Sequence, residues 1–314
     1  MTVEILEPGP LTSVQDAVGR RAWRHLGVPA GGAADPWSAR LANRLAGNAD
    51  DAALLEVTLV GPAVRVEEPM MVALVGSLEA TIDGLPWPSN TSRPVRTGSV
   101  IRVADGLDAR GYLAFGGGLA VPPVLGSPST DLRTGFGGIE GRALRTGDRL
   151  PVGTPSATTA LRWIGTQSTG PIRIVDGLHA DRLPPDAITA HPWRISSQSD
   201  RTGARLEGPA LPRADADIAS IGLPAGAIQL PPGGQPIIAL ADRQVTGGYP
   251  VPAVVIGADL GRVARLRPGD QLRFASVSVE EARGALKAAE KELAALEPLG
   301  AVDDDELRWI GSHE

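Results

Sequence analysis

Glycine and proline interrupt this sequence so regularly that its apolar segments remain short. The 39 glycines and 28 prolines are spread between those segments and do not gather in one linker. Several segments alternate apolar and polar residues, for example residues 2–8 and 54–61. Short alternating segments bounded by turn residues are typical of β-strands joined by tight turns. The sequence therefore predicts a mainly β fold.

Two segments have helical periodicity instead. Residues 35–46 repeat apolar side chains on one face, and Asp35 is placed to cap the helix. Residues 278–297 carry a second apolar stripe, and Ser278 and Glu281 have the spacing of a capping box. We expect both segments to be helices, the second packed on the protein surface and followed by an acidic tail.

A weak internal repeat divides the chain. RTGSVIRVA (96–104), RTGDRLPVG (145–153) and RPGDQLRFA (267–275) each combine a basic residue, a turn and a short alternating strand. The repeat favours two related β-rich lobes, although such turns also recur by chance in β proteins. The expected parts are a first β-barrel lobe at 1–160, a second at 161–277, and a C-terminal helix and acidic tail at 278–314.

Composition excludes several kinds of site. The chain has no cysteine, which rules out disulfides, thiolate nucleophiles and cysteine-bound zinc. Its four histidines are scattered, so we expect no metal. The net charge of −6 includes no long basic block, so we expect no nucleic acid partner. With no signal peptide and no apolar run near 20 residues, we expect a cytoplasmic protein without membrane contact.

Familiar catalytic motifs are missing. The glycines of FGGGL (115–119) precede no Gly-Lys-Ser/Thr, so a close-packed turn explains them better than a phosphate loop. No Gly-x-Ser-x-Gly nucleophile elbow is present. The loop GSPST (126–130) offers hydroxyls that suit a carboxylate or an amide, but the same groups can simply satisfy the backbone of a turn.

Three polar segments are candidate sites. Residues 11–36 contain Gln15 and Asp16, which can bind an amide or ureido group through paired donors and acceptors, together with several arginines. Residues 196–209 and LADRQVTGGYP (240–250) each contain an Asp-Arg pair next to glycine. Such pairs usually brace turns, yet their recurrence in one lobe favours a shared cleft. A solvated surface loop remains the alternative for residues 11–36, and a purely structural ion pair remains the alternative for the other two segments.

Taken together, these stretches resemble a known family. LEPGPLTSVQDAVGR, HLGVPAGGAADPWSARLANRLAGN and LEVTLVGP are similar to the carboxyltransferase-domain subunit family, and so are GFGGIEGRALRTGDRL, SDRTGARLEGPAL, ADRQVTGGYP and ADLGRVARLRPGDQLRF. That family includes KipA, the C subunits of 5-oxoprolinases and the second allophanate-hydrolase-subunit-type domain. The resemblance runs in order from about residue 1 to 275, and the C-terminal helix lies outside it.

This resemblance implies two cyclophilin-like β-barrel lobes and three open functions. The first is the C subunit of an ATP-dependent 5-oxoprolinase, which opens the lactam of 5-oxoproline to glutamate with a KipI-like B subunit and a LamB/YcsF-like A subunit. The second is a biotin-dependent carboxyltransferase acting on a urea-like substrate. The third is a KipA-type antagonist of a KipI-type kinase inhibitor. We expect no cofactor on this chain itself: the complex uses ATP, and another protein supplies any biotin.

The substrates of these relatives share planar N–H and C=O edges. Gln15, Asp16, the hydroxyl loop and Gln244 are suited to bind such edges, and Arg133 or Arg201 to hold a carboxylate. The individual catalytic residues are not predicted. The substrate-binding candidates are Gln15, Asp16, His25, Ser129, Thr130, Arg133, Arg201, Gln244, Thr246 and Tyr249. The residues expected to form structural ion pairs are Asp200, Asp242 and Arg243.

Overall fold

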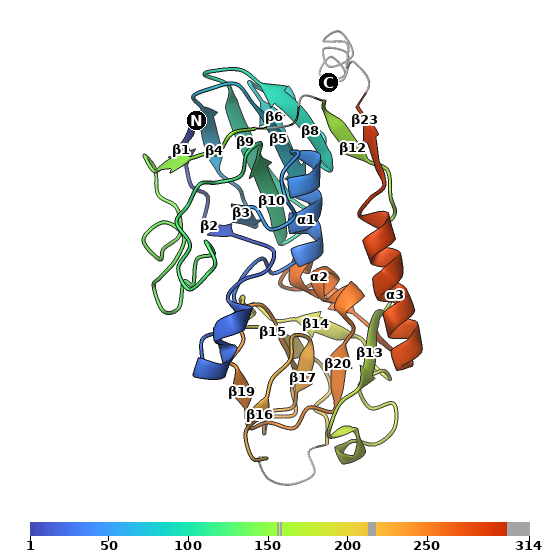
Figure 1. Ribbon diagram of the computed structural model, residues 1–314. Coiled ribbons are helices and arrows are strands. Elements are labelled where there is room, and N and C mark those ends of the chain that lie inside the picture. Colours follow the sequence, from blue (N-terminus) through green and yellow to red (C-terminus); the bar gives the residue numbers. More distant parts are fainter. Residues whose placement is uncertain (156, 158, 213–217, 300–314) are drawn as a thin grey trace. The chain divides into compact units, whose positions relative to one another are not determined.

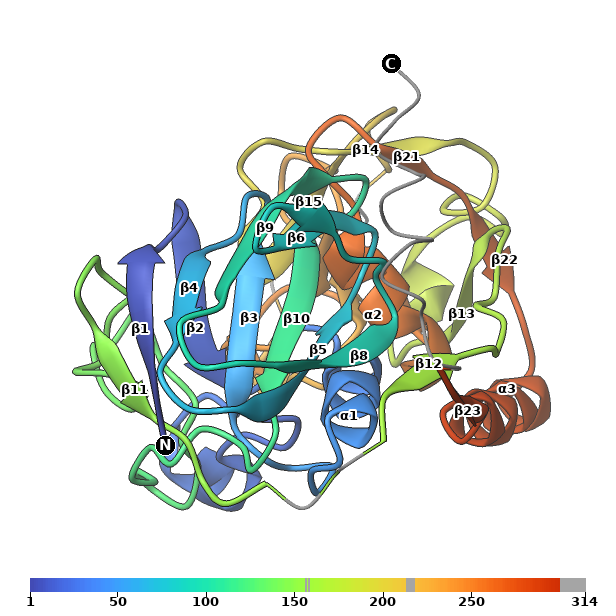
Figure 2. The same ribbon diagram turned by 90° about the horizontal axis from the view of Figure 1, so that it is seen from above.

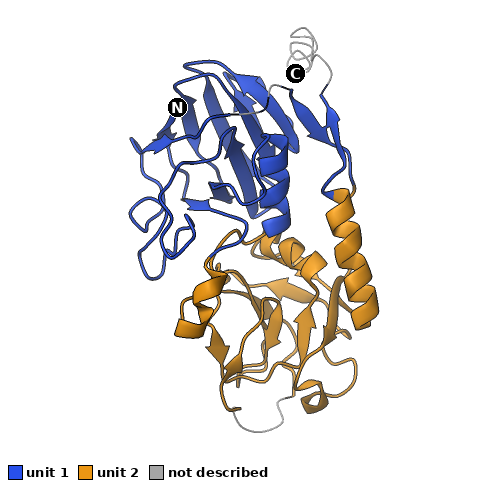
Figure 3. Ribbon diagram, viewed as in Figure 1, with its two compact units in different colours: residues 1–19, 36–165, 293–314 blue, residues 20–35, 166–292 orange. Residues whose placement is uncertain are grey.

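Two compact units make up the part of the chain that the computed structural model describes, residues 1–155, 157, 159–212 and 218–299 (Figures 1 and 3). Unit 1 contains residues 1–19 and 36–165 and the described residues from Leu293 on, and unit 2 contains residues 20–35 and 166–292. The prediction of a mainly β protein with barrel-like lobes, few helices and a C-terminal helix is confirmed. The predicted acidic tail, residues 300–314, lies outside the described residues.

The main boundary between the units lies at 165/166 and not at the expected 160/161, and residues 278–292, expected as part of a separate C-terminal segment, belong to unit 2. Two further differences concern residues 20–35 and the segment after Leu293. Residues 20–35 belong to unit 2 although they precede most of unit 1 in the sequence. The segment after Leu293 returns to unit 1. Both segments form hydrogen bonds with residues far away in the chain, Gly32 with Arg201 and residues 296–298 with residues 161–163. No local sequence pattern predicts such bonds.

Unit 1 is built from two sheets. The first has the strand order β11-β1-β4-β9-β6-β7 and the second β2-β3-β10-β5-β8-β12-β23. The strands of the first sheet are β1 (Thr2–Glu7), β4 (Ala63–Val66), β6 (Leu78–Ile82), β7 (Leu85–Pro86), β9 (Val100–Gly106) and β11 (Arg149–Pro151). Those of the second are β2 (Leu11–Gln15), β3 (Leu54–Thr58), β5 (Met70–Val75), β8 (Thr91–Val95), β10 (Arg110–Phe115), β12 (Leu161–Trp163) and β23 (Leu296–Pro298).

One hydrophobic cluster joins these two sheets. Ile5 and Ile101 from the first sheet and Leu74 and Leu113 from the second are all fully buried within it. Figure 2 shows the strands of both sheets from above. Burial of such aliphatic side chains contributes about 1.5–3 kcal/mol each, so this shared core is the main force holding the sheets together.

Helix α1 (Pro36–Leu45) covers the second sheet, mainly over β5 and β10 (Figure 1). Its apolar face is fully buried, including Leu41 and Leu45. At its first turn, Trp37 packs edge-to-face on Trp163, with ring centroids 5.3 Å apart. The helix predicted at residues 35–46 is therefore confirmed.

Unit 2 contains a sheet of eight short strands that almost closes on itself. Its order is β21-β14-β15-β18-β17-β20-β13-β22. The end strands β21 (Gln271–Leu272) and β22 (Phe274–Ser276) are separated only by Arg273, so one continuous segment pairs with both ends of the sheet. The other strands are β13 (Ile172–Asp176), β14 (Trp193–Ile195), β15 (Gly203–Glu207), β17 (Ala227–Gln229), β18 (Ile237–Ala239) and β20 (Ala253–Val255). A separate pair joins β16 (Ile221–Gly222) and β19 (Thr246–Gly247).

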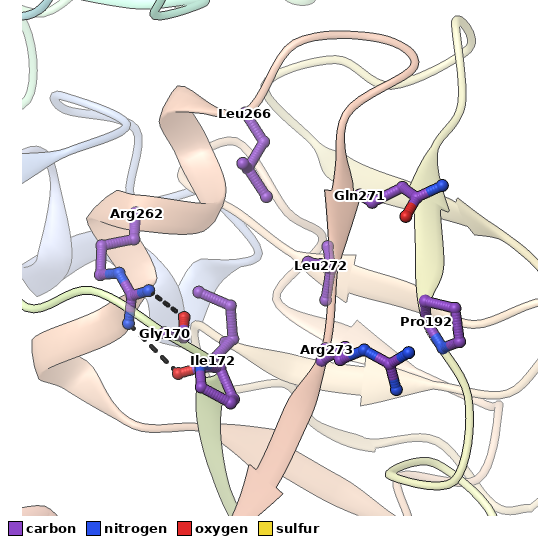
Figure 4. Close-up of a pocket in the computed structure, with 9 residues that line it drawn as sticks. Gly170, Ile172, Pro192, Arg262, Leu266, Gln271, Leu272 and Arg273 are labelled. Carbon is purple, nitrogen blue, oxygen red and sulfur yellow. Dashed lines mark hydrogen bonds between the residues drawn. The ribbon is translucent and has the colours of Figure 1, made fainter.

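A hollow marks the place where this sheet closes. Its lining includes Ile172, Leu266 and Leu272, and its volume is about 380 Å³. Arg262 lies at one side and donates hydrogen bonds to the carbonyl oxygens of Gly170 and Pro171 (Figure 4). These bonds attach helix α2 (Gly257–Arg265) to the chain just before β13.

Helix α3 (Val279–Glu292) confirms the predicted C-terminal helix and its capping box. The Ser278 N–H donates to Glu281 Oε2 at 2.7 Å, and the Glu281 N–H donates to Ser278 Oγ at 3.1 Å. The predicted extent to residue 297 is wrong, because β23 begins at Leu296 and pairs with β12. The Ile164 N–H donates to the Ala295 carbonyl oxygen at 3.0 Å, which continues the pairing of these two strands.

The three repeated segments fold into the same turn. Gly98, Gly147 and Gly269 all have left-handed φ angles, between 86° and 94°. The N–H of each glycine donates to the carbonyl oxygen of one strand residue, and the N–H of that strand residue donates to the carbonyl oxygen of the residue after the glycine. The strand residues are Val66, Ile5 and Ile195, respectively. A hydroxyl or carboxylate three residues after the basic residue accepts that residue's N–H. The repeat in the sequence therefore encodes one structural device, used twice in unit 1 and once in unit 2.

Two short 3-10 helices complete the described elements, at Arg21–Leu26 and Ala180–Arg182. Within the described residues, no helix combines the length and apolar character needed to cross a membrane.

Acid should weaken unit 2 through Asp259, a fully buried residue of α2. Burial by itself raises the pKa of Asp259, but hydrogen bonds from the side chain and backbone of Arg173 and the charge of Arg262 outweigh burial and lower it. The stabilisation is therefore complete above the ordinary pKa of 3.8 and is lost as the pH falls through the lower, folded value. We expect Asp259→Asn to be less stable than the native chain at pH 7, and the difference to shrink as the pH falls below 3.8, measured by urea unfolding.

The exposed Asp176 provides the control, since no side-chain bond is found for it in the described structure. Asp176→Asn should leave the free energy of unfolding unchanged at both pH values. A stability difference between native and Asp259→Asn chains that is the same at pH 7 and pH 3 would contradict the argument.

Candidate functional site

Gln15 is the centre of a buried polar cluster in unit 1. It is the last residue of β2 and is fully buried. Its Nε2 donates to Ser13 Oγ at 3.0 Å and to the Thr130 carbonyl oxygen at 3.1 Å. Reversing the amide would place Oε1 against that carbonyl oxygen, so the orientation is determined. Gln15 Oε1 is then a buried acceptor with no hydrogen-bond partner in the described structure, which costs free energy unless a ligand donates to it.

Asp16 and the hydroxyl loop are bound to each other. Asp16 Oδ1 accepts the N–H groups of Val18 and Gly19, and Oδ2 accepts the Ser127 hydroxyl at 2.6 Å. The Asp16 N–H in turn donates to Ser129 Oγ at 2.8 Å. The carboxylate thus organises the chain after β2, and its oxygens are already engaged by the protein.

The rest of this loop divides into a docked part and an exposed part. Thr130 donates from Oγ1 to the Val14 carbonyl oxygen at 3.0 Å, which holds the loop against β2. The side chain of Arg133 is exposed, and only its backbone N–H is bonded, to Asp131 Oδ1. The structure therefore brings Gln15, Asp16, Ser129 and Thr130 together and leaves Arg133 outside the cluster.

In unit 2, the two Asp-Arg loops do meet, but with a different pairing from the one expected. Asp242 pairs with Arg201, through Nε–Oδ2 at 2.8 Å and Nη2–Oδ1 at 3.0 Å, and not with its neighbour Arg243. Asp200 forms no ion pair in the described structure; its Oδ1 accepts the N–H groups of Thr202 and Gly203 and so braces the turn. The pairing expected within each dipeptide is corrected because the bidentate partner lies across the loops.

The same ion pair attaches the N-terminal segment to unit 2. Arg201 Nη2 also donates to the Gly32 carbonyl oxygen at 2.6 Å. Arg20 is buried in this unit as well, with 1% of its surface exposed, and its N–H donates to the Ala30 carbonyl oxygen. Arg201 therefore has a structural role, and the carboxylate-binding role expected for it stays a prediction.

The remaining candidates of unit 2 lie at the surface. His25 is exposed, with Nδ1 2.9 Å from the Ala22 carbonyl oxygen. Gln244 and Thr246 are exposed, and Tyr249 is 36% exposed. Their roles in binding stay predictions. Because Gln15 lies in unit 1, these residues and the Gln15 cluster belong to different units.

Two arginines of unit 2 that were not among the predicted binding candidates donate hydrogen bonds to one carbonyl oxygen. Arg24 is half-buried and donates from Nη2 to the Leu223 carbonyl oxygen at 3.0 Å. Arg243, expected to serve in an ion pair, donates to that same oxygen from Nε at 3.1 Å. The only sequence signal for Arg24 is the grouping of basic residues at positions 20–25. Nothing local indicates that a carbonyl 199 residues away accepts its hydrogen bond.

Neither a metal centre nor a phosphate loop emerges from the described residues. No group of three or more His, Asp or Glu side chains there is placed to hold a metal ion. A Cβ on Gly117, in FGGGL, would lie 2.4 Å from the carbonyl oxygen of Gly153. The glycines are therefore used for close packing, and the predicted close-packed turn is confirmed.

Comparison with known proteins gives consistent matches over most of the chain. The family model described as carboxyltransferase domain, subdomain A and B, matches residues 26–276. The 5-oxoprolinase C subunit of Escherichia coli (strain K12) is 40% identical over 291 residues, covering 89% of this chain and 93% of that protein. The 5-oxoprolinase C subunit of Haemophilus influenzae is 35% identical over 294 residues, with the same two coverages.

A solved structure matches the fold as well. The crystal structure of the Kluyveromyces lactis urea carboxylase superimposes with a TM-score of 0.86 and 30% sequence identity. The match covers 97% of this chain but only 30% of that chain. Both units of the present chain are therefore found together within a much longer protein.

Proposed function

Because the chain belongs to the carboxyltransferase-domain family, subdomains A and B, we propose that it acts as the C subunit of a 5-oxoprolinase. The observation that carries this proposal is the sequence identity, which is 40% with the Escherichia coli C subunit and 30% with the urea carboxylase. The chain aligns with 93% of the length of the Escherichia coli C subunit, whereas it corresponds to 30% of the urea carboxylase chain.

In this function the chain works with other proteins. We infer that a KipI-like B subunit and a LamB/YcsF-like A subunit join it, and that the complex opens the lactam of 5-oxoproline to glutamate with ATP hydrolysis. ATP use is assigned to the complex, since the glycine turn of this chain is filled by its own packing. Lactam opening then requires of this chain positioning and polar stabilisation, which need no cysteine or serine nucleophile.

The unbonded acceptor of Gln15 supports an amide-like substrate. A lactam presents one N–H beside one C=O, and Gln15 Oε1 is a buried oxygen without a donor in the described structure. Its geometry is held by the two hydrogen bonds of Nε2. An acceptor kept in place in this way discriminates strongly in favour of a ligand that donates to it, because otherwise it stays unsatisfied.

A biotin-dependent carboxyltransferase is the second candidate function. The TM-score of 0.86 with the urea carboxylase supports it, and the ureido N–H groups of biotin and the N–H groups of urea also suit Gln15 Oε1. In that case another protein would supply biotin. We rank this function second because the sequence identity with that relative is 30%, against 40% with the Escherichia coli C subunit.

Reconstitution tests the proposal. The purified chain is combined with its candidate A and B subunits, and glutamate release from 5-oxoproline is measured with and without ATP. We expect glutamate only from the full set with ATP. A complex that assembles but releases none contradicts the proposal. Carboxylation of urea by carboxybiotin would then support the second candidate, and binding of the KipI-like protein without any turnover would support an antagonist.

Two substitutions in β2 sharpen this assay. Gln15→Met preserves side-chain length but removes the acceptor, so we expect kcat/KM to fall by about 10- to 100-fold. Thr12 is also fully buried in β2, and its Oγ1 has no partner in the described structure. Thr12→Val is therefore the matched control, and turnover should be unchanged. Equal activity of the two variants would remove Gln15 from the site.

A further inference from the structure

Two arginine side chains meet at a single carbonyl oxygen in unit 2. Arg24 Nη2 and Arg243 Nε both donate to the Leu223 carbonyl oxygen, at 3.0 and 3.1 Å. The two donor nitrogens therefore lie within about 6 Å of each other. Arg243 Nη1 also donates to the Leu240 carbonyl oxygen at 3.1 Å, which fixes the position of its guanidinium group.

No carboxylate neutralises this pair within the described residues. The nearest acidic neighbour in the sequence, Asp242, is occupied by the bidentate contact with Arg201. Neither Arg24 nor Arg243 forms a salt bridge in the described structure, although Arg243 is only 9% exposed. Buried charges are ordinarily paired, so a buried arginine held beside a second arginine lacks its complement.

The electrostatics of Arg243 agree with this geometry. Burial, followed by the positive charges of Arg24 and Arg21, lowers the pKa of Arg243 to about 10. The guanidinium group is still charged at neutral pH, but in an unfavourable environment. A bound anion would relieve the repulsion between these groups.

We propose that Arg243 and Arg24, with the exposed Arg21 at the rim, form a binding site for an oxyanion, the carboxylate or phosphoryl group of a small ligand. A guanidinium group has five N–H donors in a planar fork that fits carboxylate and phosphate oxygens. Arg243 uses Nε and Nη1 for backbone oxygens, and Arg24 uses Nη2. The remaining N–H groups of both side chains are the donors for the anion. The Leu223 carbonyl oxygen holds the two guanidinium groups close to each other.

This proposal does not require the oxoprolinase function, because it concerns binding of an anion by the chain alone. A site that holds a carboxylate would take 5-oxoproline or a related acid, whereas a site that holds a phosphoryl group would take phosphate or a phosphorylated ligand. Both kinds of ligand present anionic oxygens to the arginines, and the choice of probe in the binding experiment distinguishes them.

Calorimetric titration of the full chain provides the test, at constant ionic strength adjusted with chloride. The probes are 5-oxoproline, its uncharged amide and inorganic phosphate. We expect at least one of the two anions to bind with a stoichiometry of one, and the amide not to bind. Binding of 5-oxoproline alone identifies a carboxylate site, and binding of phosphate alone identifies a phosphoryl site. Absence of binding by both anions overturns the proposal.

Substitution locates the site. Arg243→Gln and Arg24→Gln should each weaken anion binding by about tenfold or more, whereas Arg205→Gln, at an exposed position of β15, should not. Thermal unfolding guards against misfolding: the anion should raise Tm of the native and Arg205→Gln chains but not of Arg243→Gln. Arg24 lies on a 3-10 helix without buried residues, so Arg24→Gln should disturb folding less than Arg243→Gln does. Undiminished binding in both Arg243→Gln and Arg24→Gln would overturn the assignment.

Discussion

Replacing Arg201 by glutamine is expected to lower the free energy of unfolding by about 3–5 kcal/mol, because the change breaks a buried ion pair. The side chains of Arg201 and Asp242 are 6% and 10% exposed, and two hydrogen bonds join them. Glutamine would deprive the Asp242 carboxylate of this bidentate partner while leaving it buried. It would also remove the bond to the Gly32 carbonyl oxygen that holds residues 20–35 on unit 2.

Arg205 offers the same substitution four residues away. Its side chain is exposed on β15, so Arg205→Gln should change stability by no more than about 0.5 kcal/mol. Urea unfolding followed by tryptophan fluorescence measures both variants, since Trp193 is fully buried in unit 2. A loss below about 1 kcal/mol for Arg201→Gln would show that Arg201 is not structural and would restore it as a candidate for binding the substrate carboxylate.

Gly117→Ala is the second substitution with a large expected effect, about 2–5 kcal/mol of destabilisation. Gly117 has a φ of +98°, where a residue with a Cβ is strained by roughly 1–2 kcal/mol. The added Cβ would also lie 2.4 Å from the Gly153 carbonyl oxygen and 2.5 Å from its carbon. Because these are backbone atoms, they cannot move aside as a flexible side chain does, and overpacking adds about 1–3 kcal/mol.

Gly126 separates these two causes. Its φ is +80°, but nothing lies within 4 Å of the Cβ that alanine would add. Gly126→Ala should therefore cost only the strain of the left-handed backbone, about 1–2 kcal/mol. If the two variants unfold at the same urea concentration, the close approach to Gly153 contributes nothing, and the glycines of FGGGL need another explanation.

The sequence predicted those parts of the fold that depend on local chemistry. The capping box of α3, the helix beginning at Pro36 and the three repeated turns all arise from residues within a few positions of one another. The predicted end of α3 was wrong because it depends on a contact with a distant part of the chain. Residues up to 297 continue a helical pattern, and only the pairing of β23 with β12, some 135 positions away, makes them a strand.

The candidate site was predicted in the same uneven way. Gln15 was predicted as a candidate from its residue type alone, and the loop that bonds to it from its hydroxyl groups. The docking of this loop on β2 was not predictable, because it depends on contacts between residues more than 110 positions apart. The pairing of Asp242 was not predictable, because adjacency in the sequence favours Arg243 while the fold presents Arg201. For the same reason, no local pattern shows that Arg243 lacks a carboxylate partner among the described residues.

The origin of unit 2 in two separate stretches of chain constrains how the protein is made. Residues 20–35 leave the ribosome early, yet their partners Arg201 and Leu223 lie 169 and 199 residues behind the residues that they contact. At roughly 5–20 residues per second, this segment waits about 10–40 s before those partners are synthesised. During that interval Trp23 and Leu26, which remain exposed in the finished fold, have nothing to pack against in unit 2. Unit 1 also contains a break at this point, so no single cut in the chain yields either unit intact. A circularly permuted gene that begins near residue 166 would place residues 20–35 after residues 166–292 and would shorten the interval between their synthesis.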